Sequence, residues 1–144
     1  LIAWAAVTGR VELPSILLAL IIFLWTPPHF WALSLYRRDD YARAGIPMLP
    51  VTDGEEETRR QILLYTLVLV GSTIVVAPLS GLGVVYMVSA AILGAFFAIG
   101  AVRLYRTPSV PAAQGLFRFS ILYLFALFLM MCVDALMSVG LLGA

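Results

Sequence analysis

The chain has 144 residues, of which 62% are hydrophobic and only 12% are charged. A soluble domain needs a more polar surface than this composition can supply, so a soluble globular class is excluded and an integral membrane protein is predicted. The formal net charge is +1, which provides no strongly basic surface, and we expect no nucleic-acid partner.

Four apolar runs dominate the sequence. An α-helix rises about 1.5 Å per residue, so about 20 residues cross a hydrocarbon core roughly 30 Å thick. The runs do not alternate as the strands of a membrane barrel do. They are Pro14–Tyr36, Ile62–Leu79, Val84–Val102 and Phe117–Val139. We therefore predict an all-α fold, a polytopic transmembrane helix bundle with four full membrane-spanning helices.

A shorter apolar segment, Leu1–Gly9, precedes these runs and is too short to span. Thr8-Gly9 followed by Arg10 is typical of a helix end and a short exposed loop. The segment opens without an initiator Met, so we interpret it as the stub of a preceding helix. On this interpretation residues 1–144 are the C-terminal part of one larger intramembrane domain.

The first spanning helix contains the sequence Pro27-Pro28-His29. Two prolines should kink the helix about two-thirds of the way along. The kink should face the bundle interior or a cavity, because a carbonyl freed inside a membrane needs protein or water as a partner. His29 is the sole histidine and has two open interpretations: a hydrogen-bonded structural residue, or a functional one that ligates iron or transfers a proton.

Two polar segments separate the spanning helices. The longer one, Arg37–Arg60, carries five arginines and six acids. Gly45, Pro47 and Pro50 argue against one continuous helix there, and the second spanning helix should begin at Thr58. The other segment, residues 103–116, also carries arginines, whereas the opposite side has Arg10 alone. The positive-inside rule therefore places loops 37–60 and 103–116 on the cytoplasmic side, in a cell inner membrane.

Asp39 and Asp40 lie beside several arginines and also have two open interpretations. They could form ordinary solvated ion pairs. Alternatively, their oxygens could hold Mg²⁺ that bridges a diphosphate, while the forked arginine side chains contact the remaining phosphate oxygens. Adjacent residues point about 100° apart on a helix, so we expect one acid to face the metal and choose Asp40.

Other acids are predicted to be structural. The run Glu55-Glu56-Glu57 is most simply a solvated group that compensates the dipole of the next helix. Asp134 is the one acid deep in a late helix, about 25 Å from the cytoplasmic end. We interpret it as packing or helix-end polarity, although acids inside a membrane are often functional.

A long phrase resembles a known family. Residues 26–50, TPPHFWALSLYRRDDYARAGIPMLP, are preceded by IAWAAVTG and followed by TRRQILLYT. Together they closely resemble the protohaem IX farnesyltransferases (haem O synthases) of the UbiA superfamily of intramembrane prenyltransferases. The late phrase LFRFSILYLFALFLMMCVDAL resembles the last helix of that family. The resemblance covers essentially the whole chain.

The resemblance implies an activity and a set of site residues. Family members bind farnesyl diphosphate through Mg²⁺ on two acidic motifs and transfer the farnesyl group to the vinyl group of haem b, giving haem O. The implied partners are farnesyl diphosphate, haem b, membrane lipid, and haem A synthase or oxidase assembly proteins. The implied roles are Asp39, Asp40 and Tyr41 in catalysis, Asp39 and Asp40 as Mg²⁺ ligands, Arg37, Arg38 and Arg43 at the diphosphate, and His29 towards the haem acceptor.

One departure from the family pattern is serious. The first acidic motif of the family, an Asn-x-x-x-Asp-x-x-x-Asp phrase, is absent from these 144 residues. We therefore expect the chain alone to be inactive. Two alternatives stay open: another UbiA-type prenyltransferase with a quinone-precursor or other tetrapyrrole acceptor, and a non-catalytic membrane subunit or transporter half.

Overall fold

The structure is a computed structural model that describes residues 1–138 and 140, and this part of the chain contains helices and no strands. The helices are α1 (Ile2–Thr8), α2 (Leu13–Tyr36), α3 (Arg38–Arg43), α4 (Leu49–Thr52), α5 (Glu55–Ser80), α6 (Val84–Arg106) and α7 (Val110–Ser138). Four of them, α2, α5, α6 and α7, are long and apolar enough to cross a membrane. The predicted all-α, multi-pass architecture is confirmed.

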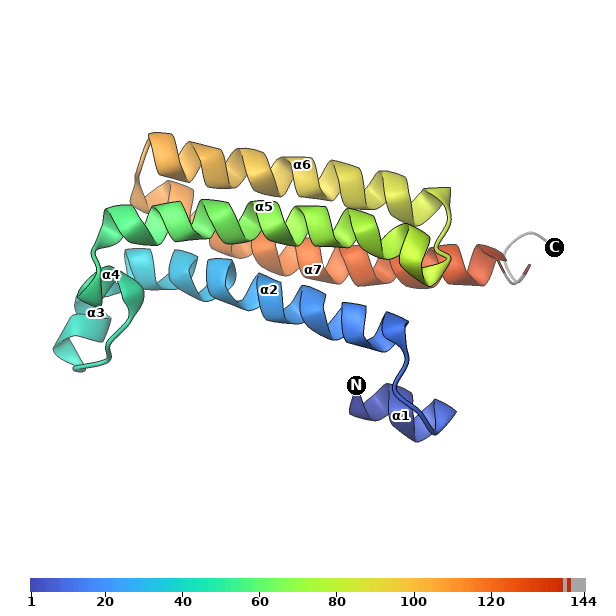
Figure 1. The fold of residues 1–144 in the computed structure, drawn as a ribbon. Helices are drawn as coiled ribbons and strands as arrows, with labels where there is room; N and C mark the ends of the chain where they lie inside the picture. Colours follow the sequence, from blue (N-terminus) through green and yellow to red (C-terminus); the bar gives the residue numbers. More distant parts are fainter. Residues whose placement is uncertain (139, 141–144) are drawn as a thin grey trace.

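The four long helices form an antiparallel bundle in which each packs against two others (Figure 1). Helix α2 lies against α5 and α7, and α6 lies against the same two helices from the other side. Both polar segments therefore lie at one end of the bundle, where α2 and α6 end and α5 and α7 begin. We call this the charged end.

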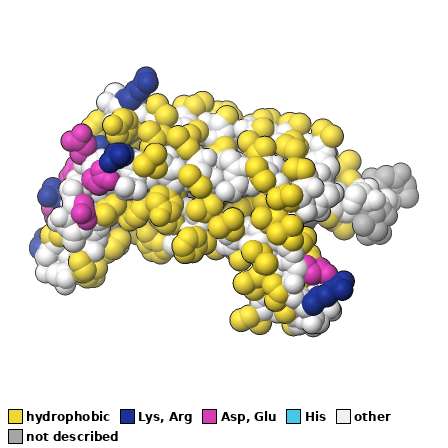
Figure 2. Space-filling view, viewed as in Figure 1, with side chains coloured by type: hydrophobic (Ala, Val, Ile, Leu, Met, Phe, Trp, Pro, Cys, Tyr) yellow, Lys and Arg dark blue, Asp and Glu magenta, His cyan; other side chains and the backbone are white. Residues whose placement is uncertain are grey.

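The long sides of the bundle are apolar. Figure 2 shows hydrophobic side chains along the whole length of the bundle, with charged side chains gathered at the charged end and near α1. Phe23 on α2 and Phe125 on α7 are 66% and 67% exposed. In a bilayer such side chains face hydrocarbon, which accounts for an outer surface as apolar as the core.

Small residues bring α5 and α6 close together. Ala90 and Ala101 are fully buried. A Cβ atom added to Gly94 would lie only 2.7 Å from Cγ1 of Val70 on α5. The two helices can keep this separation only because position 94 has no side chain.

The predicted helix boundaries are wrong at both polar segments. Helix α5 begins at Glu55 rather than Thr58, and α7 begins at Val110 rather than Phe117. The acids of the first turn of α5 are favourable beside the positive end of the helix dipole, so the helix starts within the polar run. Pro111 sits in the first turn of α7, where proline is tolerated.

The expected break in the longer polar segment agrees with the structure, and so does the expected burial at the prolines of α2. The segment after α2 is divided into the short helices α3 and α4, with Gly45 between them at φ +68°. Helix α2 itself continues through both prolines, and Pro28 and His29 are buried against the other helices rather than exposed to lipid.

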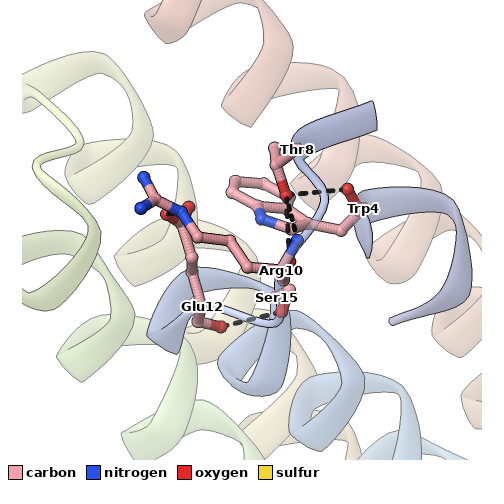
Figure 3. A network of polar contacts seen from close by, with 5 residues as sticks. All are labelled: Trp4, Thr8, Arg10, Glu12 and Ser15. Atoms are coloured by element: carbon pink, nitrogen blue, oxygen red, sulfur yellow. Dashed lines mark hydrogen bonds and ion pairs between the residues drawn. The ribbon is translucent and has the colours of Figure 1, made fainter. Parts of the chain in front are cut away.

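The short helix α1 is joined to α2 by a polar link (Figure 3). The Thr8 hydroxyl at the end of α1 lies within hydrogen-bonding distance of the carbonyl oxygens of Trp4 (3.0 Å) and Arg10 (2.9 Å). Arg10 Nε lies 2.6 Å from Glu12 Oε1, and the Ser15 hydroxyl donates to the Glu12 carbonyl at 2.7 Å. These contacts fix the turn between the two helices.

Asp134 stabilises the opposite end of the bundle. Its side chain is 5% exposed, and its carboxylate accepts hydrogen bonds from the backbone N–H groups of Gly83 (2.5 Å) and Tyr86 (3.2 Å). These donors lie at the N-cap and in the first turn of α6, where backbone N–H groups have no partner within the helix. Asp134 thus supplies, from α7, the helix-end polarity expected of it.

Candidate functional site

The residues predicted to bind diphosphate and metal line one hollow at the charged end, which we call the outer hollow. Its volume is about 380 Å³. It is lined by Leu35, Tyr36, Arg37, Arg38, Asp39, Asp40, Arg43, Glu55 and Val110. Helix α3 begins directly after α2 ends, so a local turn is enough to bring all five predicted charged residues to the hollow.

Asp40 is the best-connected acid of the outer hollow. Arg37 Nη1 donates to its Oδ2 at 3.1 Å, and Arg43 Nη2 donates to its Oδ1. The hydrogen bond from Arg37, and then that from Arg43, lowers the pKa of the Asp40 carboxyl below its ordinary value. The carboxylate is therefore ionised at neutral pH, although 48% of its side chain is exposed and the pairs themselves stabilise the fold little.

Glu55 ties the outer hollow to the bundle. Arg38 Nη1 lies 3.1 Å from Glu55 Oε1, so this contact joins α3 to the first turn of α5. Glu55 Oε2 also lies 3.6 Å from Arg59 Nη1, one helical turn further along α5. The acids and arginines of the outer hollow thus balance, with Arg37, Arg38 and Arg43 matched by Asp39, Asp40 and Glu55.

A second hollow, the inner hollow, lies where the ends of all four long helices meet. Its volume is about 210 Å³. It is lined by Leu35, Tyr36, Glu55, Arg59, Leu104, Pro108, Ser109, Val110 and Ala113. Four of these residues also line the outer hollow, so the two adjoin. Sequence reasoning did not assign Arg59 to the site; its only signal was the i,i+4 spacing from Glu55.

His29 lies deeper in the bundle and lines neither hollow. Its Nδ1 is 2.6 Å from the Ser120 hydroxyl on α7, and its ring stacks between Trp25 (centroids 4.2 Å apart) and Phe117 (4.6 Å apart). Trp25 Nε1 donates to the Ser120 carbonyl at 2.8 Å. The structure therefore gives His29 a packed, hydrogen-bonded setting and keeps it apart from Asp40.

Tyr41 is half-buried and is not among the residues that line the two hollows. Phe30 and Trp31, which follow His29 on α2, also line neither hollow. Phe30 is 46% exposed on α2, and Trp31 packs edge-on against Tyr65 of α5. The described residues bring together the charged part of the predicted site but not Tyr41 or His29.

The carboxylates of the outer hollow fit a loosely held Mg²⁺ ion. Within residues 1–138 and 140, no group of three or more His, Cys, Asp or Glu side chains could hold a metal ion by itself. Mg²⁺ commonly takes only one or two carboxylates and completes its shell with phosphate oxygens and water. Asp39 and Asp40 in one open hollow match that donor set.

Comparison with known proteins gives a consistent family. Curated relatives named protoheme IX farnesyltransferase include those of Azorhizobium caulinodans (54% identical over 140 residues, 94% of this chain and 46% of the relative) and Nitrobacter hamburgensis (52% over 139 residues, 94% and 45%). A Rhodopseudomonas palustris protein of that name is 55% identical over 137 residues, 92% of this chain and 44% of the relative.

The chain thus spans about half the length of the curated relatives it matches. No solved structure matches it. The model of the UbiA prenyltransferase family matches residues 1–129. The chain belongs to the UbiA prenyltransferase family.

Proposed function

We propose that the protein is a protohaem IX farnesyltransferase, which transfers the farnesyl group of farnesyl diphosphate to a vinyl group of haem b and forms haem O. One observation carries the reaction class: the outer hollow gathers three carboxylates, two of them the adjacent Asp39 and Asp40, and three arginines at the end of an apolar membrane bundle. The choice of haem b as acceptor rests on the names of relatives that are more than 50% identical.

The charged residues divide into two groups of roles. Asp39 and Asp40 would hold Mg²⁺, which when bound neutralises charge on the leaving diphosphate. Arg37, Arg38 and Arg43 would bind the phosphate oxygens through charge-assisted hydrogen bonds. Arg37 and Arg43 now pair with Asp40. A cation bound at Asp40 would release Arg37 and Arg43 from their ion pairs. Both guanidinium groups could then bind phosphate oxygens.

The apolar bundle suits the rest of the reaction. The bond between C1 of the farnesyl group and the diphosphate oxygen breaks, and its electron pair leaves with the diphosphate. The vinyl π electrons of haem b then form the new carbon–carbon bond, and water adds to the resulting cation and releases a proton. Water must be kept away until that last step, which a membrane-embedded site allows.

His29 is proposed as a residue on the acceptor side. Its support is its depth in α2 and its position between two aromatic rings, a setting that offers flat apolar surface beside an imidazole. Tyr41 is proposed to act from α3 beside Asp40. The charged end is proposed to face the cytoplasm of a cell inner membrane, because both arginine-bearing segments lie there.

The full-length protein provides the test. Purified protein in lipid vesicles should convert labelled farnesyl diphosphate and haem b to haem O when Mg²⁺ is present, and it should not prenylate an aromatic acid. Asp40→Ala should abolish turnover while membrane insertion stays normal. Asp53→Ala is the matched control, because Asp53 is exposed on the same polar segment and lines neither hollow.

Two results would count against the proposal. Haem O formation by Asp40→Ala at the rate of the control would remove the assigned role of this acid. Prenylation of the aromatic acid in place of haem b would move the protein to another branch of the family.

A further inference from the structure

Arg59 differs from the other arginines near the two hollows. Arg37, Arg38 and Arg43 have side chains 60%, 49% and 78% exposed, and each pairs with an acid. The Arg59 side chain is only 15% exposed. Its Nε is shielded from solvent and has no hydrogen-bond partner among the described residues. Its nearest acidic contact, 3.6 Å from Nη1 to Glu55 Oε2, is too long for a hydrogen bond.

A shielded Nε–H group without a hydrogen-bond partner is an unfavourable arrangement for a fold. Buried polar groups are almost always hydrogen-bonded, and an exception calls for an explanation such as a bound ion or ligand. Arginine suits an oxyanion in particular, because its planar fork presents parallel N–H groups to two oxygens. Arg59 also lines the inner hollow, which at about 210 Å³ has room for several water molecules of about 30 Å³ each.

We propose that Arg59 binds a phosphate group of the prenyl diphosphate in the inner hollow, an inference that rests on the proposed function. The inner hollow adjoins the outer hollow through Leu35, Tyr36, Glu55 and Val110. A diphosphate whose metal is held at Asp40 can therefore extend one phosphate towards Arg59. A haem propionate is the other oxyanion of the reaction, but among the described residues His29, the proposed acceptor-side residue, does not line this hollow.

Glu55 restrains this site. Its carboxylate faces Arg59 at 3.6 Å and Arg38 at 3.1 Å, and it lines both hollows. It therefore repels an incoming phosphate and competes for both guanidinium groups. Removing its charge should strengthen diphosphate binding, whereas removing the charge of Arg59 should weaken it.

The experiment measures the dissociation constant of farnesyl diphosphate with Mg²⁺, together with kcat and KM for haem O formation, in the full-length protein. Arg59→Gln should weaken binding about ten- to hundredfold, the loss expected for a hydrogen bond to a charged group. Arg59→Lys should lose less, because an ammonium keeps the charge without the fork. Arg60→Gln is the control, since Arg60 is 63% exposed and pairs with Glu57 on the surface.

The Glu55→Gln variant provides a test that misfolding cannot imitate. It should tighten binding several-fold, and a misfolded variant cannot produce that result. Binding of haem b and of its propionate dimethyl ester forms the second arm. If Arg59→Gln weakens binding of haem b but not of its ester or of farnesyl diphosphate, the ligand is a propionate and the inference is overturned.

The remaining outcomes separate the inference from the proposed function. If the wild type makes haem O and Arg59→Gln binds farnesyl diphosphate as well as Arg60→Gln does, the inference alone is overturned. If the wild type makes no haem O but binds inorganic pyrophosphate with Mg²⁺ in a way that Arg59→Gln weakens, the proposed acceptor chemistry is overturned and the phosphate site is supported.

Discussion

Gly94 fixes the distance between α5 and α6, and Gly94→Ala should destabilise the bundle. The added Cβ would lie 2.7 Å from Val70 Cγ1, whereas carbon atoms in contact are about 3.5–4.0 Å apart. Relief requires a movement of roughly 1 Å. Val70 is β-branched and stiff about χ1, so its side chain cannot turn aside without strain. Overpacking of this kind costs about 1–3 kcal/mol.

A double-mutant cycle tests whether the clash between position 94 and Val70 causes the loss of stability. Unfolding by SDS in mixed micelles, followed by circular dichroism, gives the free energy of unfolding of each variant. Gly71→Ala, on the same pair of helices, is the control, because nothing lies within 4 Å of its added Cβ. Val70→Ala removes the obstructing methyl groups, so Gly94→Ala should cost much less in that background. Equal losses with Val70 and with Ala at position 70 would refute the steric reasoning.

Two further predictions concern the ends of the bundle. Asp134→Ala should lower the free energy of unfolding by about 1–2 kcal/mol, because the N–H groups of Gly83 and Tyr86 lose their acceptor. The same SDS titration measures this loss of stability. An unchanged midpoint of the titration would contradict the prediction. In whole cells, a Ser109→Cys variant should resist a membrane-impermeant maleimide that labels Arg10→Cys, because Ser109 belongs to the charged end; the reverse pattern would invert the proposed orientation.

Hydropathy was sufficient to predict the four spanning helices but not their ends. It marks where apolar side chains stop, whereas a helix stops where backbone hydrogen bonding stops. Helix α5 therefore includes Glu55, and α7 includes the polar turn from Val110 onwards. The short helices α3 and α4 escaped prediction because their lengths, 6 and 4 residues, are set by Gly45 and the neighbouring prolines rather than by any periodicity.

The grouping of the site residues likewise depends partly on local sequence and partly on contacts between segments that are distant in the sequence. Asp40 lies three residues from both Arg37 and Arg43, so their grouping follows from the sequence alone. Arg59 becomes notable only because the link between α6 and α7 lines the inner hollow together with it. The contact between His29 and Ser120 spans 91 positions in the sequence, and no local pattern indicates it.

The two best-connected aspartates illustrate why only one is suited to chemistry. Asp134 is 5% exposed and accepts from the backbone N–H groups of Gly83 and Tyr86, which the fold holds in place. Asp40 accepts from the side chains of Arg37 and Arg43, which are 60% and 78% exposed and can turn away at little cost. A ligand cannot replace donors that belong to a helix end, but it can replace mobile guanidinium groups and then bind them itself. The acid whose partners can be exchanged is therefore the one at which we propose that a metal and a diphosphate enter.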